Sequence, residues 1–373
     1  MTTKIHMRFK KLIHKIFNLR KKASDDELLG DAKNVLMSGT FKTDFDFFTY
    51  SKKNIFNLLS SNSNYGFYYW PYGYLFRHVK WGSPNDLGFR CKENFYEINE
   101  LHKDKYLIGF FGGSTGYDVL VKNTETLVFY LEQKLNQDQQ LKKKYGEFKI
   151  INFSQPGNVL MNQMINYIQF GKLVDLKLII SHNSGNDFGT GLINDPKILK
   201  KYKIAYVDLM EVWAKKIHEA YDVDIEMLRM NKNSKNFKKV EVKTDADTVI
   251  QSYIFRCLQF EKMIINDNKI FISGIMPHVF SKKNLSDDEK KIFETYNPYY
   301  ANVNKYLPDV YKKLFQKYYD RISHQNLVNL HESFYDLPKN VSHFGDIVHL
   351  LSPGNKVAAY RYYEKIKQIL FKL

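Results

Sequence analysis

Short apolar runs alternate with amphipathic helical patterns from residue 106 to the end of this chain. The runs lie at 106–111, 148–153, 176–181, 269–275 and 327–331. Helical patterns follow most of them, at 124–135, 158–170, 251–265 and 353–371. A continuous apolar strand is typical of a parallel sheet buried on both faces, and amphipathic helices between the strands cover those faces. The alternation therefore predicts an α/β fold of three layers, with a parallel sheet between two layers of helices.

The same pattern divides the 373 residues into three expected parts. Residues 1–22 form a basic tail, 23–103 an N-terminal extension, and 104–373 the α/β domain. The segment 188–250 is rich in Lys, Asp and Asn and interrupts the alternation. We expect it to form an inserted, partly helical lobe.

Two local signals add detail to this outline. The aromatic stretch 65–72 could offer flat ring faces to a sugar, or could pack within the extension. Near the other end, Ser352 is expected to cap the last helix, because its hydroxyl can accept a free backbone N–H. Pro353 then suits the first helical position.

The net charge of +16 is concentrated at one end of the chain. Residues 1–22 contain no acidic residue and carry eight basic ones: Lys4, Arg8, Lys10, Lys11, Lys15, Arg20, Lys21 and Lys22. Their apolar residues recur near helical spacing, which indicates an amphipathic basic helix that could lie on an anionic membrane surface. A helix packed on its own domain, or a frayed tail, fits the same pattern. Charge without a recognised motif does not predict nucleic-acid binding.

Neither secretion nor a membrane span is expected. There is no run of about 18 apolar residues, and the N-terminus lacks the continuous apolar core of a signal peptide. The two cysteines, Cys91 and Cys257, have no CxxC spacing, so neither a disulfide framework nor a structural zinc site is expected. We therefore expect a cytoplasmic protein with reduced thiols, which could contact the inner face of the membrane through residues 1–22.

Polar and small residues follow the apolar runs at the points where strands should end. Ser114 comes after the first run, Gly157 after the second and Asn186 after the third, while Asp346 and His349 precede the last helix. Ligands of open parallel sheets bind outside the carboxyl ends of the strands. The shared position predicts that these residues meet at one edge of the sheet.

These residue types suit a hydrolytic triad. A serine hydroxyl becomes a nucleophile when a base removes its proton, and imidazole, which titrates near neutrality, is the usual base. Asp346 would accept from the second ring nitrogen of His349 and fix its tautomer. A loop-to-helix hydrogen bond between Asp346 and His349, and a local turn at Asn186 and Asp187, are the structural alternatives. No cofactor is expected, and His182, His278 and His343 have no convincing metal spacing.

Two other interpretations of the serine turn fit less well. A phosphate-binding loop would need Lys-Ser or Lys-Thr at a spacing that this chain lacks. The run Gly112-Gly113-Ser114-Thr115-Gly116 does match the G-x-S-x-G elbow of α/β-hydrolases. Those enzymes generally place the acid and the histidine on separate loops, whereas Asp346 and His349 are three residues apart.

Taken together, these elements resemble the SGNH (GDSL-like) hydrolase superfamily. The resemblance lies in four blocks: Gly112-Gly113-Ser114-Thr115, Gln155-Pro156-Gly157, Gly185-Asn186-Asp187 and Asp346-Ile347-Val348-His349. Upstream, Asn85-Asp86-Leu87-Gly88-Phe89-Arg90 resembles the segment before the first block in many bacterial members. The first block departs from Gly-Asp-Ser-Leu in a way that many members share. The third usually opens with glycine where this chain has Ser184, and we expect the neighbouring Gly185 to supply the same flexibility.

The resemblance implies a flavodoxin-like fold and a bacterial serine esterase that works through an acyl-enzyme. It implies an oxyanion hole made by the backbone N–H groups of Ser114 and Gly157 and the side-chain amide of Asn186, with glycine at 157 allowing a close approach of the main chain. The implied substrates are O-acyl esters, in particular O-acetyl esters, on a surface carbohydrate or its precursor. An O-acyltransferase with the same triad, and a non-catalytic glycan-binding or membrane-surface module, are the alternatives.

Overall fold

The computed structural model describes ten stretches of the chain: 66–70, 73–77, 89–91, 93–118, 120–155, 157–193, 196–202, 242–294, 301–322 and 326–372. The basic tail over 1–22, with its expected helix and membrane contact, lies outside the described residues, as does most of the expected extension over 23–103.

Five parallel strands form the central sheet, in the order β4-β3-β5-β6-β7. The strands are β3 (Lys105–Gly112), β4 (Glu147–Asn152), β5 (Leu178–Asn183), β6 (Ile270–Ile275) and β7 (Leu327–Asn329). Each of the five apolar runs overlaps one of these strands, so the predicted parallel sheet is confirmed. Counted from β3, the order is 2-1-3-4-5, the order of flavodoxin-like sheets.

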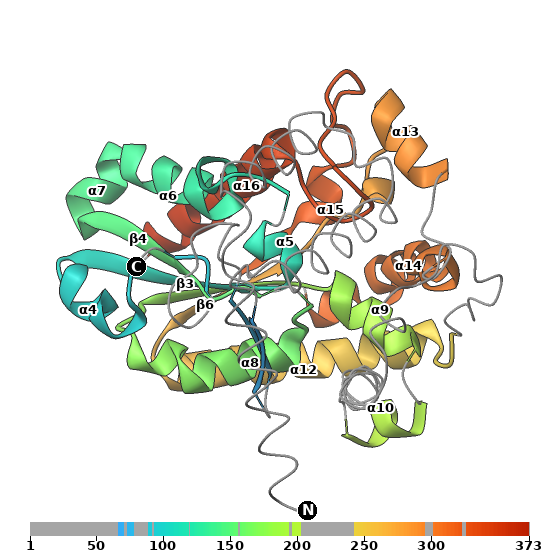
Figure 1. Ribbon diagram of the computed structural model, residues 1–373, viewed down its shortest axis with the longest axis horizontal. Coiled ribbons are helices and arrows are strands. Elements are labelled where there is room, and N and C mark those ends of the chain that lie inside the picture. The colour runs from blue at the N-terminus through green and yellow to red at the C-terminus, as the bar shows by residue number, and fades with distance from the viewer. Residues whose placement is uncertain are drawn as a thin grey trace, which may run out of the picture.

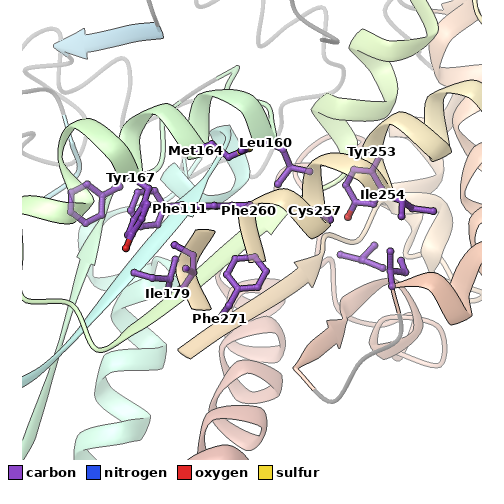
Figure 2. Close-up of a cluster of buried hydrophobic side chains, with 14 of the residues drawn as sticks. Phe111, Leu160, Met164, Tyr167, Ile179, Tyr253, Ile254, Cys257, Phe260 and Phe271 are labelled. Carbon is purple, nitrogen blue, oxygen red and sulfur yellow. The ribbon is translucent and has the colours of Figure 1, made fainter. Parts of the chain in front are cut away.

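Helices cover both faces of this sheet (Figure 1). Alternate side chains of β3 point to opposite faces, so Phe111 packs under α8 (Leu160–Gln169) and α12 (Ala246–Asn266). Figure 2 shows this core, in which the ring centroids of Phe111 and Phe260 are 6.2 Å apart. Phe110 instead packs with α6 (Leu127–Gln137) and α16 (Ser352–Leu370). The expected three-layer α/β/α architecture is therefore present.

The remaining helices and turns complete the described part of the chain. They are the helices α4 (Ile98–Leu101), α5 (Ser114–Tyr117), α7 (Gln139–Tyr145), α9 (Gly185–Ile193), α10 (Pro196–Tyr202), α13 (Asp287–Glu294), α14 (Ala301–Lys313) and α15 (Leu330–Ser333), with a π-helical turn at Leu314–Tyr318 and 3₁₀ turns at 95–97, 123–125, 171–173, 279–281 and 319–321. Most of the aromatic stretch 65–72 belongs to β1 (Gly66–Trp70), which pairs antiparallel with β2 (Gly73–Arg77) in a separate hairpin.

The segment 188–250 begins within α9 and ends within α12, while 203–241 lie outside the described residues, so the insertion stays a prediction. One sequence expectation needs correction. Ser352 is not the N-cap of α16: Leu351 is, and Ser352 is the first helical residue. The hydroxyl of Ser352 bonds to that of Tyr130, 2.7 Å away, so it ties α16 to α6 instead of capping its own helix.

Cys91 and Cys257 are both buried, and neither forms a disulfide bond. Among the helices that the structure describes, none combines the length and the apolarity that a membrane span needs.

Candidate active site

Ser114 begins the one-turn helix α5, which follows strand β3 after the single residue Gly113. The turn closes through hydrogen bonds from the N–H of Tyr117 to the carbonyl of Gly113 (2.9 Å) and from the N–H of Asp118 to that of Ser114 (2.8 Å). A methyl group on Gly116 would lie 2.6 Å from Ser154 Oγ, which is too close for contact. Small residues are therefore needed where this turn packs on the residues that follow β4.

Asp346, His349 and Ser114 form one continuous hydrogen-bonded chain. His349 Nδ1 lies 2.5 Å from Asp346 Oδ2, and His349 Nε2 lies 2.7 Å from Ser114 Oγ. The second oxygen of Asp346 accepts the backbone N–H groups of Val348 and His349, at 2.9 and 2.7 Å. One short loop thus holds acid and imidazole together, 232 residues or more after the serine that the imidazole contacts.

Electrostatics keep Asp346 ionised. The carboxyl group is fully buried, and burial alone would raise its pKa. The hydrogen bond and electrostatic interaction with His349, together with the backbone N–H donors, outweigh burial, so the pKa of Asp346 lies below its ordinary value. A carboxylate here keeps a proton on Nδ1 of His349 and leaves Nε2 free to accept from Ser114.

Asn186 lies against both of the other loops. Its side-chain Nδ2 donates to the backbone carbonyl of Asn158, 2.9 Å away. A methyl group on Gly113 would lie only 2.5 Å from the same nitrogen. The amide of Asn186 therefore sits beside the residue that precedes Ser114 and is bonded to the residue that follows Gly157.

Gly157 has a φ of 82°, a left-handed conformation that itself favours glycine, and a Cβ there would meet no protein atom within 4 Å. The close approach of its main chain to an oxyanion stays a prediction. The expectation for Gly185 was wrong. In the third block it is Ser184, not Gly185, that adopts a positive φ, of 110°. The hydroxyl of Ser184 bonds to that of Tyr311 in α14 at 2.7 Å, which offsets part of the strain.

Asp187 and two histidines outside the four blocks are buried around the site. Asp187 is buried, accepts the N–H of Leu160 at the start of α8 with both oxygens, and pairs with Arg256 at 3.3 Å. Burial lowers the pKa of His182 and His278 to about 3, so both imidazoles are neutral. His182 Nδ1 lies 2.8 Å from the hydroxyl of Tyr362.

Arg90, in the segment before the first block, makes contacts that the sequence does not reveal. Its guanidinium donates to the carbonyls of Tyr117 (2.6 Å) and Asp118 through Nη1, to that of Val121 through Nη2 (2.8 Å), and to Asn123 Oδ1 through Nε (3.0 Å). These acceptors belong to the turn that leaves the serine helix. Arg90 therefore ties the segment before the domain to the C-terminal side of the Ser114 turn.

Asp118 is a second buried carboxyl near the triad that sequence reasoning missed. One of its oxygens accepts the N–H of Leu127 at 2.7 Å, and Asn355 of α16 also contacts its side chain. Burial raises the pKa of Asp118 to about 7, although the nearby charge of Arg90 lowers it in part. Asp118 has a left-handed φ of 63°. The sequence around it does not indicate this conformation.

Met276, just after β6, was also missed. Thr115, the neighbour of Ser114, directs its hydroxyl at Met276 Sδ, 3.8 Å away. A methyl group on Gly185 would lie 2.9 Å from the same sulfur and 3.0 Å from His278 Nε2. The thioether thus fills the space between the serine turn and the start of α9, which carries Asn186.

No family model matches the sequence, and no curated protein matches it. Solved structures with a similar fold include the acetyl xylan esterase AlAXEase (14% identity, 70% of this chain and 99% of that one, TM-score 0.37). They also include a catalytic mutant of Axe2, an acetylxylan esterase from Geobacillus stearothermophilus (11%, 70% and 94%, 0.36), and the lipase Lip_vut3 from a goat rumen metagenome (14%, 70% and 97%, 0.38). At such TM-scores the likeness decides nothing about chemistry, which rests on the site geometry.

Proposed function

We propose that this protein is a serine ester hydrolase of the SGNH type, with Ser114 as nucleophile, His349 as general base and Asp346 as its orienting acid. The observation that carries the proposal is the hydrogen-bonded chain from Asp346 through His349 to Ser114, at the carboxyl edge of a parallel sheet. Distances of 2.5 and 2.7 Å are within the reach that proton transfer needs.

In the first half of the reaction, His349 Nε2 takes the proton of Ser114 Oγ as that oxygen attacks the ester carbonyl carbon. The imidazolium that forms lies against the carboxylate of Asp346, which stabilises its charge without accepting the proton. The tetrahedral intermediate then collapses, and His349 returns the proton to the leaving alkoxide. An alcohol departs and the acyl group stays on Ser114.

The negative charge on the former carbonyl oxygen needs donors. The backbone N–H groups of Ser114 and Gly157 and the amide of Asn186 fit this role, because Asn186 is adjacent to Gly113 and bonded to Asn158. The amide nitrogen of Asn186 carries two hydrogens, and the bond to Asn158 uses one. In the second half of the reaction, water attacks the acyl carbon with His349 as base, which releases the acid and restores Ser114.

We propose that the acyl group is short, an O-acetyl on a bacterial surface carbohydrate or its precursor. Met276 fills the space beside Thr115 and Gly185, next to Ser114, and we propose that its side chain limits the length of the acyl group. The carbohydrate part rests on the resemblance in the sequence motifs and on nothing else in the fold.

A panel of p-nitrophenyl esters and acetylated glycans, offered to wild type, Ser114→Ala and His349→Ala, tests the proposal. We expect acetate release by wild type and a loss of about 10³-fold or more in both variants. Turnover that does not change in either folded variant would contradict it. Transfer of the acetyl group to an added sugar hydroxyl, with little free acetate, would identify an acyltransferase instead.

A further inference from the structure

The loop that carries Asp346 and His349 is closed on itself. Phe344 and Leu350 form an antiparallel bridge, and the N–H of Leu351 donates to the carbonyl of His343 at 2.8 Å. These bonds fix the shape of residues 343–351 but not the position of the loop relative to Ser114. Contacts with other segments must set that position.

A buried carboxylate receives the start of this loop. Glu289 Oε1 accepts the backbone N–H groups of His343 (2.8 Å) and Phe344 (3.3 Å). Its other oxygen, Oε2, lies 2.6 Å from Lys282 Nζ, and neither side chain has any exposed surface. Burial would raise the pKa of Glu289, but Lys282 and the N–H donors outweigh it and lower the pKa, so the group is charged.

Lys282, the partner of Glu289, also contacts this loop and the residues just before it. Its Nζ donates to the carbonyl of Val341 (3.3 Å) and lies 3.2 Å from Nδ1 of His343. Burial and the charge of Lys282 lower the pKa of His343, so a neutral ring accepts from the lysine. Lys282 and Glu289 together make four hydrogen bonds to residues 341–344. Three of them end on two adjacent residues, His343 and Phe344, just before Asp346.

Stability alone does not explain a fully buried ion pair. Removing two charges from water costs about as much as their attraction returns, and an apolar pair of similar volume is often equally stable. Glu289 also completes a capping box at the start of α13, where it accepts the N–H of Ser286 at 2.8 Å. A cap needs only an exposed Glu or Gln, whereas Glu289 reaches inward to a second segment.

We propose that Glu289, supported by Lys282, is a positioning residue that holds the Asp346–His349 loop so that His349 Nε2 reaches Ser114. It acts through the two backbone N–H groups that it accepts, and the lysine fixes the carboxylate in place. The proposal rests on the proposed hydrolase function. A displacement of about 1 Å at a reacting group can cost around 10²-fold in rate, so the anchor matters for turnover more than for folding.

Two double variants separate the effect of the hydrogen-bond acceptor at position 289 from the effect of the buried charges. Lys282→Met with Glu289→Gln removes both charges but keeps an amide oxygen for His343 and Phe344. Lys282→Met with Glu289→Ala removes both charges and the acceptor. We expect kcat on p-nitrophenyl acetate to stay within about threefold of wild type in the Gln variant and to fall at least about tenfold in the Ala variant, with KM little changed. Labelling of Ser114 by a fluorophosphonate should slow in parallel.

Asp288→Ala is the control for the start of α13, because it removes an exposed first-turn acid that pairs with Lys291 of the same helix, and it leaves both Glu289 and the Ser286–Ser342 bond in place. We expect it to lower the melting temperature without lowering kcat. If a double variant does not fold, Glu289→Asp replaces it. This change keeps the carboxylate charge but moves its oxygens about one methylene away from the loop. We expect it to lower kcat as the Ala variant would. Equal kcat in the two double variants, or wild-type kcat in Glu289→Asp, would overturn the proposal.

Hydrogen exchange gives a reading that does not depend on turnover. The amides of His343 and Phe344 should stay protected in the Gln variant and exchange faster in the Ala variant. If wild type shows no Ser114-dependent turnover, the proposed function fails while this exchange result still decides whether Glu289 anchors the loop. Unchanged protection in the Ala variant would contradict the anchor even in an active enzyme.

Discussion

At the scale of single residues, Asn186 combines two contacts that a turn-forming asparagine would not need. Its amide nitrogen is bonded to Asn158 and packed on Gly113. Loss of one oxyanion donor typically costs about 2.7–4 kcal/mol of transition-state stabilisation. We therefore predict that Asn186→Ala lowers kcat about 10²–10³-fold with little change in KM, measured by steady-state kinetics. A folded variant with wild-type kcat would leave Asn186 as a turn residue.

The buried carboxyl of Asp118 gives a pH-dependent prediction for stability. The folded chain holds this proton up to about pH 7, whereas an unfolded aspartate releases it near pH 4. Between these values the folded state binds more protons, so this group makes stability fall as the pH rises. Asp118→Asn, which can still accept from Leu127, should gain stability relative to wild type by about 1.4 kcal/mol per pH unit between about pH 5 and 7. Urea unfolding of both proteins across this range measures it, and a difference that does not vary with pH would refute the raised pKa.

At the scale of elements, the end of β6 meets the start of α9 through Met276. Met276→Ala would open room beside Thr115, so we predict a shift in chain-length preference from acetyl toward butyryl and hexanoyl esters. One methylene of fit is worth about 1–3 kcal/mol, or roughly 10–200-fold in kcat/KM. A p-nitrophenyl ester series measures the shift.

Met164→Ala is the matched control for this change. It removes the same side chain from the core under α8, away from the serine turn. It should lower stability without altering the chain-length profile. An identical profile in wild type and both variants would contradict a role for Met276 in substrate choice.

The strands were predictable from sequence because burial on both faces leaves continuous apolar runs. The fifth run was too long by two residues, since Leu330 lies in α15, and an apolar run alone does not separate strand from helix. Helix α14 was not predicted, because Pro308 lies inside it. Ser352 fits the N-cap pattern, but its hydroxyl finds a better partner in Tyr130, which no local pattern reveals.

At the scale of the whole molecule, the parallel sheet explains why the site residues could be predicted at all. Every strand ends at the same edge, so Ser114, Asn186 and the loop of Asp346 and His349 meet there although they are far apart in the chain. The supporting contacts of Arg90 and Glu289 could not be predicted. Each contact depends on a segment that is distant in sequence, and the local motifs in which Arg90 and Glu289 stand do not indicate it.

The charge distribution along the whole chain supports one further proposal, that residues 1–22 bring the protein to an anionic membrane surface on the cytoplasmic side. Eight basic residues without an acidic one predict binding that weakens with salt. Flotation with phosphatidylserine vesicles should recover the full chain at low salt and lose it in 0.5 M salt, a concentration of roughly 4 Å Debye length. A chain that lacks 1–22 should not float. Equal flotation of both chains would place any membrane contact elsewhere.

The central claim is that His349 activates Ser114 for acyl transfer. Labelling by a fluorophosphonate, followed by mass spectrometry of the modified peptide, tests it most directly. We predict a single adduct on Ser114 in wild type, no adduct in Ser114→Ala, and labelling slowed by about 10³-fold or more in His349→Ala. Labelling of folded wild type at another residue, or none at all, would contradict the account.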